Sequence, residues 1–166
     1  MSNLVFLVLG ASVLALAFAF FFFKQMMKED EGTDTMKKIA AYVRRGAMAY
    51  LKQQYKVVTI VFCVLTVIFA VMAIFKLQNG IVWFAFLTGG FFSGLAGFFG
   101  MKTATYASAR TANAARKTLN SGLQVAFRSG AVMGLVVVGL ALLDVSLWFI
   151  VLKTPDFWNL SAQRLI

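Results

Sequence analysis

A chain of 166 residues could form one soluble domain, but 61% of these residues are hydrophobic and only 13% are charged. A water-soluble protein of this length has too little interior to bury so much apolar surface, so the composition excludes a soluble fold and indicates a membrane protein. The net charge of +10 does not indicate nucleic-acid binding, because the basic residues form two clusters that alternate with apolar stretches of membrane length and make no aromatic-interleaved basic motif.

The first predicted element is a transmembrane helix at residues 1–24. Fourteen of residues 4–23 are Leu, Val or Phe, and together they favour insertion by about 4 to 8 kcal/mol. A cleaved signal peptide is the alternative, because residues 15–17 resemble a cleavage site. A signal peptide has positive charge before its apolar core, whereas here Lys24 and Lys28 follow the core. We therefore expect a retained helix whose N-terminus lies outside the cytoplasm.

The second predicted element is a cytoplasmic loop and a basic amphipathic helix at residues 25–56. Four acidic residues lie between positions 29 and 34, and from Met36 onward apolar residues recur at steps of three or four. Two interpretations of this helix remain open. It rests on anionic lipid headgroups, or it extends the next helix into the cytoplasm.

The second transmembrane helix is predicted at residues 57–76, and a short external turn leads to a long third helix at residues 81–118. A helix of this length measures about 57 Å, whereas the hydrocarbon core of a bilayer is about 30 Å thick. The third helix is therefore predicted to project into the cytoplasm.

The fourth transmembrane helix is predicted at residues 123–153, after a turn at residues 120–122, and an external tail follows at residues 154–166. With this topology both basic clusters lie on the cytoplasmic side, as the positive-inside rule requires. The fold class predicted from these elements is an all-α integral membrane protein with four transmembrane helices and both ends outside the cytoplasm.

Small residues recur on the third helix, where Gly94, Gly97 and Gly100 lie three apart. Small residues let helix backbones approach closely within lipid. A substrate path would need polar groups on the same face, and the membrane portion has few. We therefore interpret the glycines as a packing surface.

Asp144 is the acidic residue inside a predicted span. A carboxylate at the bilayer centre costs about 2.5 to 3.5 kcal/mol, which the apolar residues of the fourth helix outweigh. Two interpretations remain open for it. Asp144 lines an ion path, or, as we favour, it makes an interhelical hydrogen bond or lies near the interface.

Basic residues surround the predicted cytoplasmic turn between the third and fourth helices: Arg110, Arg116, Lys117 and Arg128. They could contact an anionic ligand such as a phosphate compound. We favour the alternative that they reach lipid headgroups or pair with acidic residues of a cytoplasmic domain outside this chain.

No motif for catalysis or metal binding is found. The chain has no histidine, and its single cysteine, Cys63, lies in an apolar run. There is no phosphate-binding Gly-rich loop followed by Lys-Ser/Thr and no His-Glu-x-x-His motif. Six acidic residues, four of them in one loop, cannot supply a magnesium cluster. The sequence therefore predicts no catalytic, cofactor-binding or metal-binding residue.

Three segments nevertheless resemble a known family, the membrane-bound pyrophosphatases. They are GFFSGLAGFFGMK at residues 90–102, ARTANAAR at 109–116 and AFRSGAVMG at 126–134, and residues 39–55 are similar to the family's second helix. The resemblance covers nearly the whole chain. One departure is Ser108, where many members have Asn.

The resemblance implies a homodimeric pump with about sixteen helices per subunit. Such a pump uses Mg²⁺ to hydrolyse inorganic pyrophosphate and exports protons or sodium ions, and some branches need K⁺. It implies that this chain is the N-terminal portion, a scaffold of the first four helices that packs against the remaining helices in a membrane, here a bacterial plasma membrane. The family's substrate and metal ligands belong to later helices, so no catalytic residue is carried over and the chain alone is predicted to be inactive. The alternative is a complete small four-helix membrane protein that acts as an assembly or interaction partner.

Overall fold

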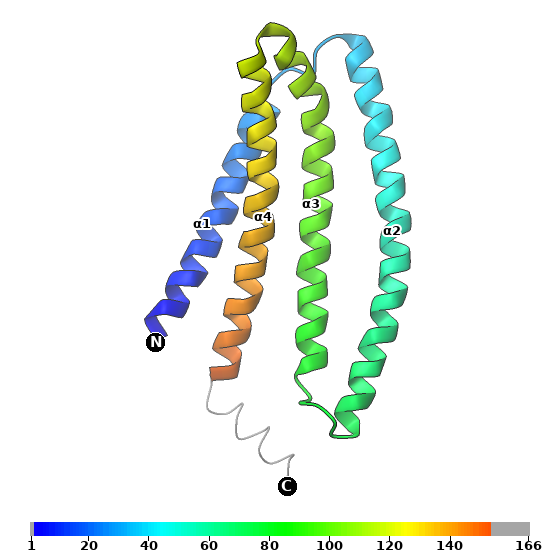
Figure 1. The fold of residues 1–166 in the computed structure, drawn as a ribbon, viewed down its shortest axis with the longest axis vertical. Coiled ribbons are helices and arrows are strands. Elements are labelled where there is room, and N and C mark those ends of the chain that lie inside the picture. The colour runs from blue at the N-terminus through cyan, green and yellow to red at the C-terminus, as the bar shows by residue number, and fades with distance from the viewer. Residues whose placement is uncertain (1, 154–166) are drawn as a thin grey trace.

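The computed structural model describes residues 2–153, and every element in this range is an α-helix. The helices are α1 (Ser2–Met27), α2 (Asp34–Ile74), α3 (Val82–Lys117) and α4 (Leu119–Lys153) (Figure 1). Each is long and apolar enough to cross a membrane. The predicted fold class, an all-α integral membrane protein, is confirmed. The predicted external tail at residues 154–166 lies outside the described residues.

Helix α2 is one continuous helix of 41 residues, or about 60 Å at 1.5 Å per residue. The amphipathic residues that were predicted within 25–56 form its first part, and the apolar residues of 57–76 form its second part. Thr33 caps the start, because its hydroxyl accepts a hydrogen bond from the backbone N–H of Met36 at 3.4 Å. The helix therefore extends about 30 Å beyond the thickness of a hydrocarbon core.

The connection between α3 and α4 is shorter than the sequence predicts. Thr118 alone separates the two helices, with extended backbone dihedral angles. Ser121 lies in the first turn of α4, where its hydroxyl donates to the carbonyl oxygen of Ala114 at 2.6 Å and thereby satisfies an acceptor at the end of α3. A Cβ atom at Gly122 would lie 2.6 Å from Cβ of Ala115. The glycine of the predicted turn thus permits a close approach of α4 to α3, and α4 begins at Leu119, four residues before the predicted start at residue 123.

The four helices lie in a row, in the order α1, α4, α3, α2 (Figure 1). Helix α4 packs against both α1 and α3, and α2 contacts α3 but neither α1 nor α4. The arrangement is therefore an open layer and not a closed four-helix bundle, and much of the apolar surface of α2 is exposed.

The best-packed core lies at one end of this layer. Met26 at the end of α1 is fully buried against Ala107 and Ala114 of α3 and Val125 of α4. The membrane portion is held instead by small residues. A Cβ atom at Gly139 of α4, for example, would lie 2.9 Å from the side chain of Leu16 on α1.

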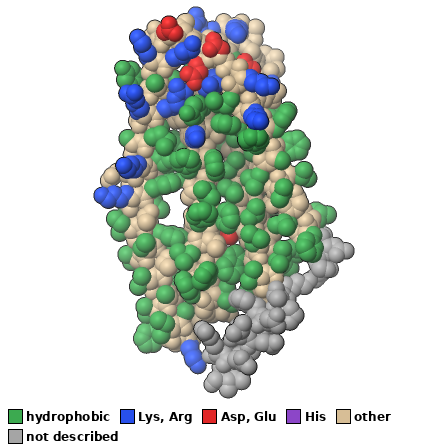
Figure 2. All heavy atoms as spheres, turned by 180° about the vertical axis from the view of Figure 1, so that it is seen from behind, with side chains coloured by type: hydrophobic (Ala, Val, Ile, Leu, Met, Phe, Trp, Pro, Cys, Tyr) green, Lys and Arg blue, Asp and Glu red, His purple; other side chains and the backbone are tan. Residues whose placement is uncertain are grey.

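Charged side chains gather at the same end, where the α1–α2 loop and the α3–α4 turn lie (Figure 2). Apolar side chains cover most of the remaining surface in this view. This separation is what a membrane protein with one strongly basic aqueous side requires. The assignment of that side to the cytoplasm stays a prediction.

Candidate functional site at the charged end

The α1–α2 loop is held in a tight conformation by Gly32. Its φ of +92° lies in the left-handed region that side-chain-bearing residues rarely adopt. A Cβ atom there would also lie 2.7 Å from Sδ of Met36 and 2.8 Å from Oδ1 of Asn113. The turn therefore requires glycine, and it brings the acidic residues of the loop against α3.

Glu31 in this loop accepts hydrogen bonds from two arginines. Nη1 of Arg44 on α2 lies 2.7 Å from Oε1 of Glu31, and Nη2 lies 3.3 Å from Oε2. Nη1 of Arg110 on α3 lies 2.8 Å from the same Oε1. One carboxylate thus joins α2 and α3, which we call the Glu31 clamp (Glu31, Arg44 and Arg110).

Arg110 is the most enclosed member of the clamp, with 7% of its surface exposed. Besides Glu31, it donates from Nε to the carbonyl oxygen of Glu29 at 3.0 Å and from Nη1 to that of Tyr106 at 2.7 Å. The guanidinium of Arg44 lies over the ring of Tyr106, 4.8 Å from its centroid. A buried cation is tolerated here because its donors meet acceptors.

The two guanidinium groups lower the pKa of Glu31 below its ordinary value. The hydrogen bond from Arg44 is the largest cause, burial opposes it, and the charges of Arg110 and Arg44 add to it. The carboxylate is therefore ionised at neutral pH, and its electrostatic role is to neutralise two arginines at the packed end of the helices.

Two further contacts attach the loop to the same helices. Nδ2 of Asn113 donates to the carbonyl oxygen of Asp30 at 3.2 Å, and Nη1 of Arg128 on α4 lies 3.4 Å from Oε1 of Glu29. The loop is thus bound to α2, α3 and α4. These hydrogen bonds and ion pairs position the three helices around the loop.

The four basic residues predicted around the α3–α4 turn divide into two pairs. Arg110 and Arg128 pair with acidic residues of this chain, so the expectation that their partners lie in a domain outside the chain is wrong for these two. Arg116 and Lys117 are exposed, and Arg116 contacts Sδ of Met36 at 3.6 Å. The sequence did not predict the acidic loop as the partner of these arginines, because 79 residues separate Glu31 from Arg110. The charge pattern could have indicated it, since four acidic residues precede a strongly basic segment.

The glycines of α3 contact two different helices. The hydroxyl of Tyr55 on α2 donates to the carbonyl oxygen of Gly94, and a Cβ atom at Gly97 would lie 3.1 Å from the same hydroxyl. A Cβ atom at Gly100 would instead lie 3.2 Å from Met133 on α4. Residues three apart shift by roughly 60° around a helix, so the series turns from α2 toward α4. It forms a packing surface for two neighbours.

Asp144 faces α3, because a Cβ atom at Gly89 would lie 3.6 Å from Oδ2 of Asp144. Among the side chains of residues 5–152, none is paired with this carboxylate. The interhelical hydrogen bond of this region is made one turn further along α4, where Nε1 of Trp148 donates to Oγ1 of Thr88 at 2.7 Å. Among the two interpretations of Asp144, neither is tested by this geometry.

The described part of the chain contains no group of three His, Cys, Asp or Glu residues that could hold a metal ion. Cys63 is a free thiol on the apolar surface of α2. The prediction that the chain carries no catalytic, cofactor-binding or metal-binding residue stays a prediction.

Comparison with known proteins identifies the family. The family described as inorganic H+ pyrophosphatase matches residues 13–165. A relative from Bacteroides thetaiotaomicron, named as a candidate K(+)-stimulated pyrophosphate-energized sodium pump, is 70% identical over 153 residues, which are 92% of this chain and 21% of the relative. A K(+)-insensitive pyrophosphate-energized proton pump from Methanosarcina mazei is 40% identical over 157 residues, which are 94% of this chain and 23% of the relative.

A K(+)-stimulated pyrophosphate-energized sodium pump from Thermotoga maritima is 41% identical over 144 residues, which are 84% of this chain and 19% of the relative. The chain thus spans about one fifth of the length of the curated relatives that it matches. Because the match extends over nearly all of its residues, the chain belongs to the inorganic H+ pyrophosphatase family.

Proposed function

We propose that this chain forms the N-terminal four helices of a membrane pump that couples hydrolysis of inorganic pyrophosphate to export of an ion. The family match over residues 13–165, together with relatives about five times as long, carries this proposal. In such a pump the remaining helices supply the substrate site, and Mg²⁺ is bound by ligands outside this chain. The assembled pump is a homodimer in the bacterial plasma membrane.

The role of this segment within the pump is structural. The Glu31 clamp fixes the α1–α2 loop on α3, and the open row of helices leaves broad apolar faces for lipid and for further helices. The arginines of the clamp already donate to acceptors within the chain, so the clamp positions helices and does not bind pyrophosphate. The residues of this segment thus act on catalysis only through the helices that they support.

The exported ion is proposed to be sodium, with stimulation by K⁺. The relative at 70% identity is named for both properties, whereas relatives near 40% identity are named for either ion. Sodium uptake into inverted vesicles that carry the full-length protein, measured with and without K⁺, tests this assignment. Proton uptake that persists without sodium would contradict it.

The scaffold role is tested by expressing the protein as two chains. One chain comprises residues 1–166, and the other comprises the segment that follows in the full-length protein. We expect Mg²⁺-dependent release of phosphate from pyrophosphate only from membranes that contain both chains. Hydrolysis by residues 1–166 alone would refute the scaffold role. Full activity of the second chain alone would favour the alternative, in which residues 1–166 are an independent interaction partner.

A further inference from the structure

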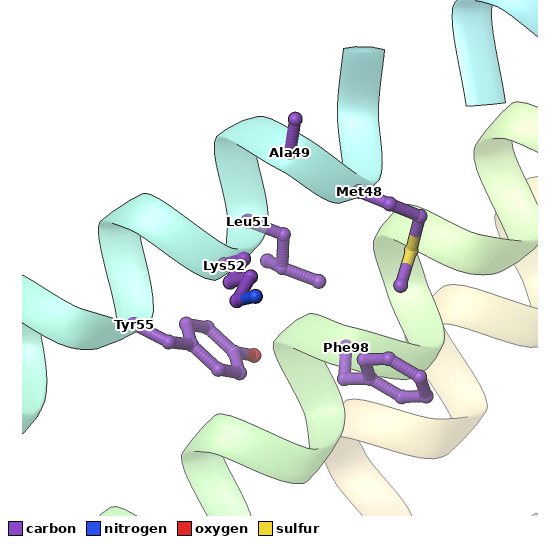
Figure 3. A pocket seen from close by; sticks show the side chains of 6 residues that line it. All are labelled: Met48, Ala49, Leu51, Lys52, Tyr55 and Phe98. Atoms are coloured by element: carbon purple, nitrogen blue, oxygen red, sulfur yellow. The ribbon is translucent and has the colours of Figure 1, made fainter. Parts of the chain in front are cut away.

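A groove opens between α2 and α3 next to the Tyr55–Gly94 contact. It has a volume of about 440 Å³ and is lined by Met48, Ala49, Leu51, Lys52 and Tyr55 of α2 and Phe98 of α3. Figure 3 shows the apolar side chains of both helices around it, with Lys52 among them. The hydroxyl of Tyr55 is already bonded to the backbone of α3, so the lining is an apolar surface with one cation.

The groove lies where the apolar part of both helices ends. On α2 the nineteen apolar-rich residues from Val57 to Phe75 follow directly after Lys52 and Lys56, and they measure about 28 Å as a helix, close to the thickness of a hydrocarbon core. On α3 the residues from Val82 to Met101 have a similar length, and Lys102 follows them. The groove is therefore at the level of lipid headgroups, with its apolar wall continuing toward the acyl chains.

Two lysines at this level have no acidic partner in the described part of the chain. Among residues 5–152, whose side chains the structure describes, the ion pairs involve Arg44, Arg110 and Arg128, and none involves a lysine. Lys52 lines the groove and is exposed. The ammonium group of Lys102 on α3 lies over the ring of Phe98, 5.8 Å from its centroid, and Phe98 is a lining residue of the groove.

We propose that the groove between α2 and α3 binds an anionic phospholipid. One acyl chain lies against Leu51, Tyr55 and Phe98, and the phosphate is bound by Lys52, with Lys102 as a second cation. A free phosphate would make no use of the apolar lining, and a zwitterionic lipid would leave the positive charge of the lysines uncompensated. The structure thus favours an occupant that has both an apolar chain and a net negative headgroup. This inference does not depend on the pump activity.

Native mass spectrometry of the full-length protein, titrated with phosphatidylglycerol or phosphatidylcholine in detergent, tests the proposal. We expect Lys52→Gln to weaken retention of phosphatidylglycerol about fivefold, the contribution of one lysine near an anionic headgroup. Lys52→Arg should retain it, and phosphatidylcholine should be bound equally by all variants. Lys38→Gln is the matched control, because Lys38 is an exposed lysine of the same helix that does not line the groove.

An equal loss in Lys38→Gln and Lys52→Gln would overturn the proposal, since the attraction would then be general surface charge. A photoreactive benzoylphenylalanine at Ala49 provides a second measurement. A phosphatidylglycerol adduct is the expected product. Crosslinks to peptides of the same protein would show that another helix fills the groove and would also overturn the proposal. Both readouts are independent of pyrophosphate hydrolysis, so failure of the lipid site and failure of the proposed pump function remain distinguishable.

Discussion

Replacing Arg110 by lysine should loosen the α1–α2 loop without changing the charge of the protein. Arg110 donates to Glu31 and to the carbonyl oxygens of Glu29 and Tyr106. The single nitrogen of a lysine can keep the bond to the carboxylate but cannot reach both carbonyl groups in the same fork geometry. The loss of about two hydrogen bonds at roughly 1 kcal/mol each amounts to about 2 kcal/mol. Local opening of the loop should therefore become about thirtyfold more frequent.

Hydrogen exchange measured by mass spectrometry on the full-length protein provides the assay. The informative peptide covers residues 28–37, where the amide of Glu29 bonds to the carbonyl oxygen of Met26 at 3.2 Å and that of Lys37 to Thr33 at 3.0 Å. Exchange that follows local opening reports the opening free energy directly. We expect the protection of these amides to fall about thirtyfold in Arg110→Lys, in line with the loss of about 2 kcal/mol.

Arg116→Lys is the matched control. Arg116 lies on the same helix and is exposed, and among the described residues its hydrogen bond is to Sδ of Met36. Its replacement should change the opening free energy by no more than about 0.5 kcal/mol. Equal exchange rates in the two variants would refute the conclusion that the clamp holds the loop.

Three further outcomes are expected. Gly90→Ala should lower the unfolding midpoint by several degrees, because its Cβ atom would overlap the ring of Phe62 and such overpacking costs about 1 to 3 kcal/mol. Gly94→Ala, where no atom lies within 4 Å of the Cβ position, is the control, and equal midpoints would contradict the α2–α3 contact. Gly32→Ala should increase exchange in the α1–α2 loop by at least about fivefold, since the φ of +92° and the crowded Cβ position cost more than about 1 kcal/mol. Unchanged exchange would refute the strained turn. The pKa of Glu31 is lowered by its arginines, so the stabilising contribution of the carboxylate is complete above about pH 4.5 and is lost as the pH falls through the folded-state pKa. Protection factors of the α1–α2 loop amides that decline instead between pH 8 and pH 5 would contradict this assignment.

The helices follow from the sequence because each depends on local hydrophobicity and periodicity. The third helix, for example, is predicted at residues 81–118, and α3 is Val82–Lys117. The reversal at Thr118 could not be predicted in the same way. The segment from Asn120 to Gly122 has the composition of a turn, but the hydroxyl of Ser121 and the missing side chain of Gly122 serve helix packing instead.

The contacts between helices were beyond prediction for a different reason. Nothing local in the sequence pairs Glu31 with Arg110, or places α4 between α1 and α3. Small residues at 94, 97 and 100 indicate close helix packing but not which neighbour each residue meets. Such pairings are set by the three-dimensional order of the helices, which one sequence read by itself does not contain.

The row of helices also has a consequence for the order of assembly during synthesis. Helix α1 packs mainly against α4, whose contact at Gly139 lies more than a hundred residues after Met27. At roughly 5 to 20 residues per second, α1 spends on the order of 5 to 20 s in the bilayer before its partner emerges from the ribosome. Ser12, buried in the finished fold, donates to the carbonyl oxygen of Leu9 within its own helix at 2.7 Å. Its hydroxyl is therefore satisfied throughout this interval, and the helix can remain inserted without exposing an unpaired donor to lipid.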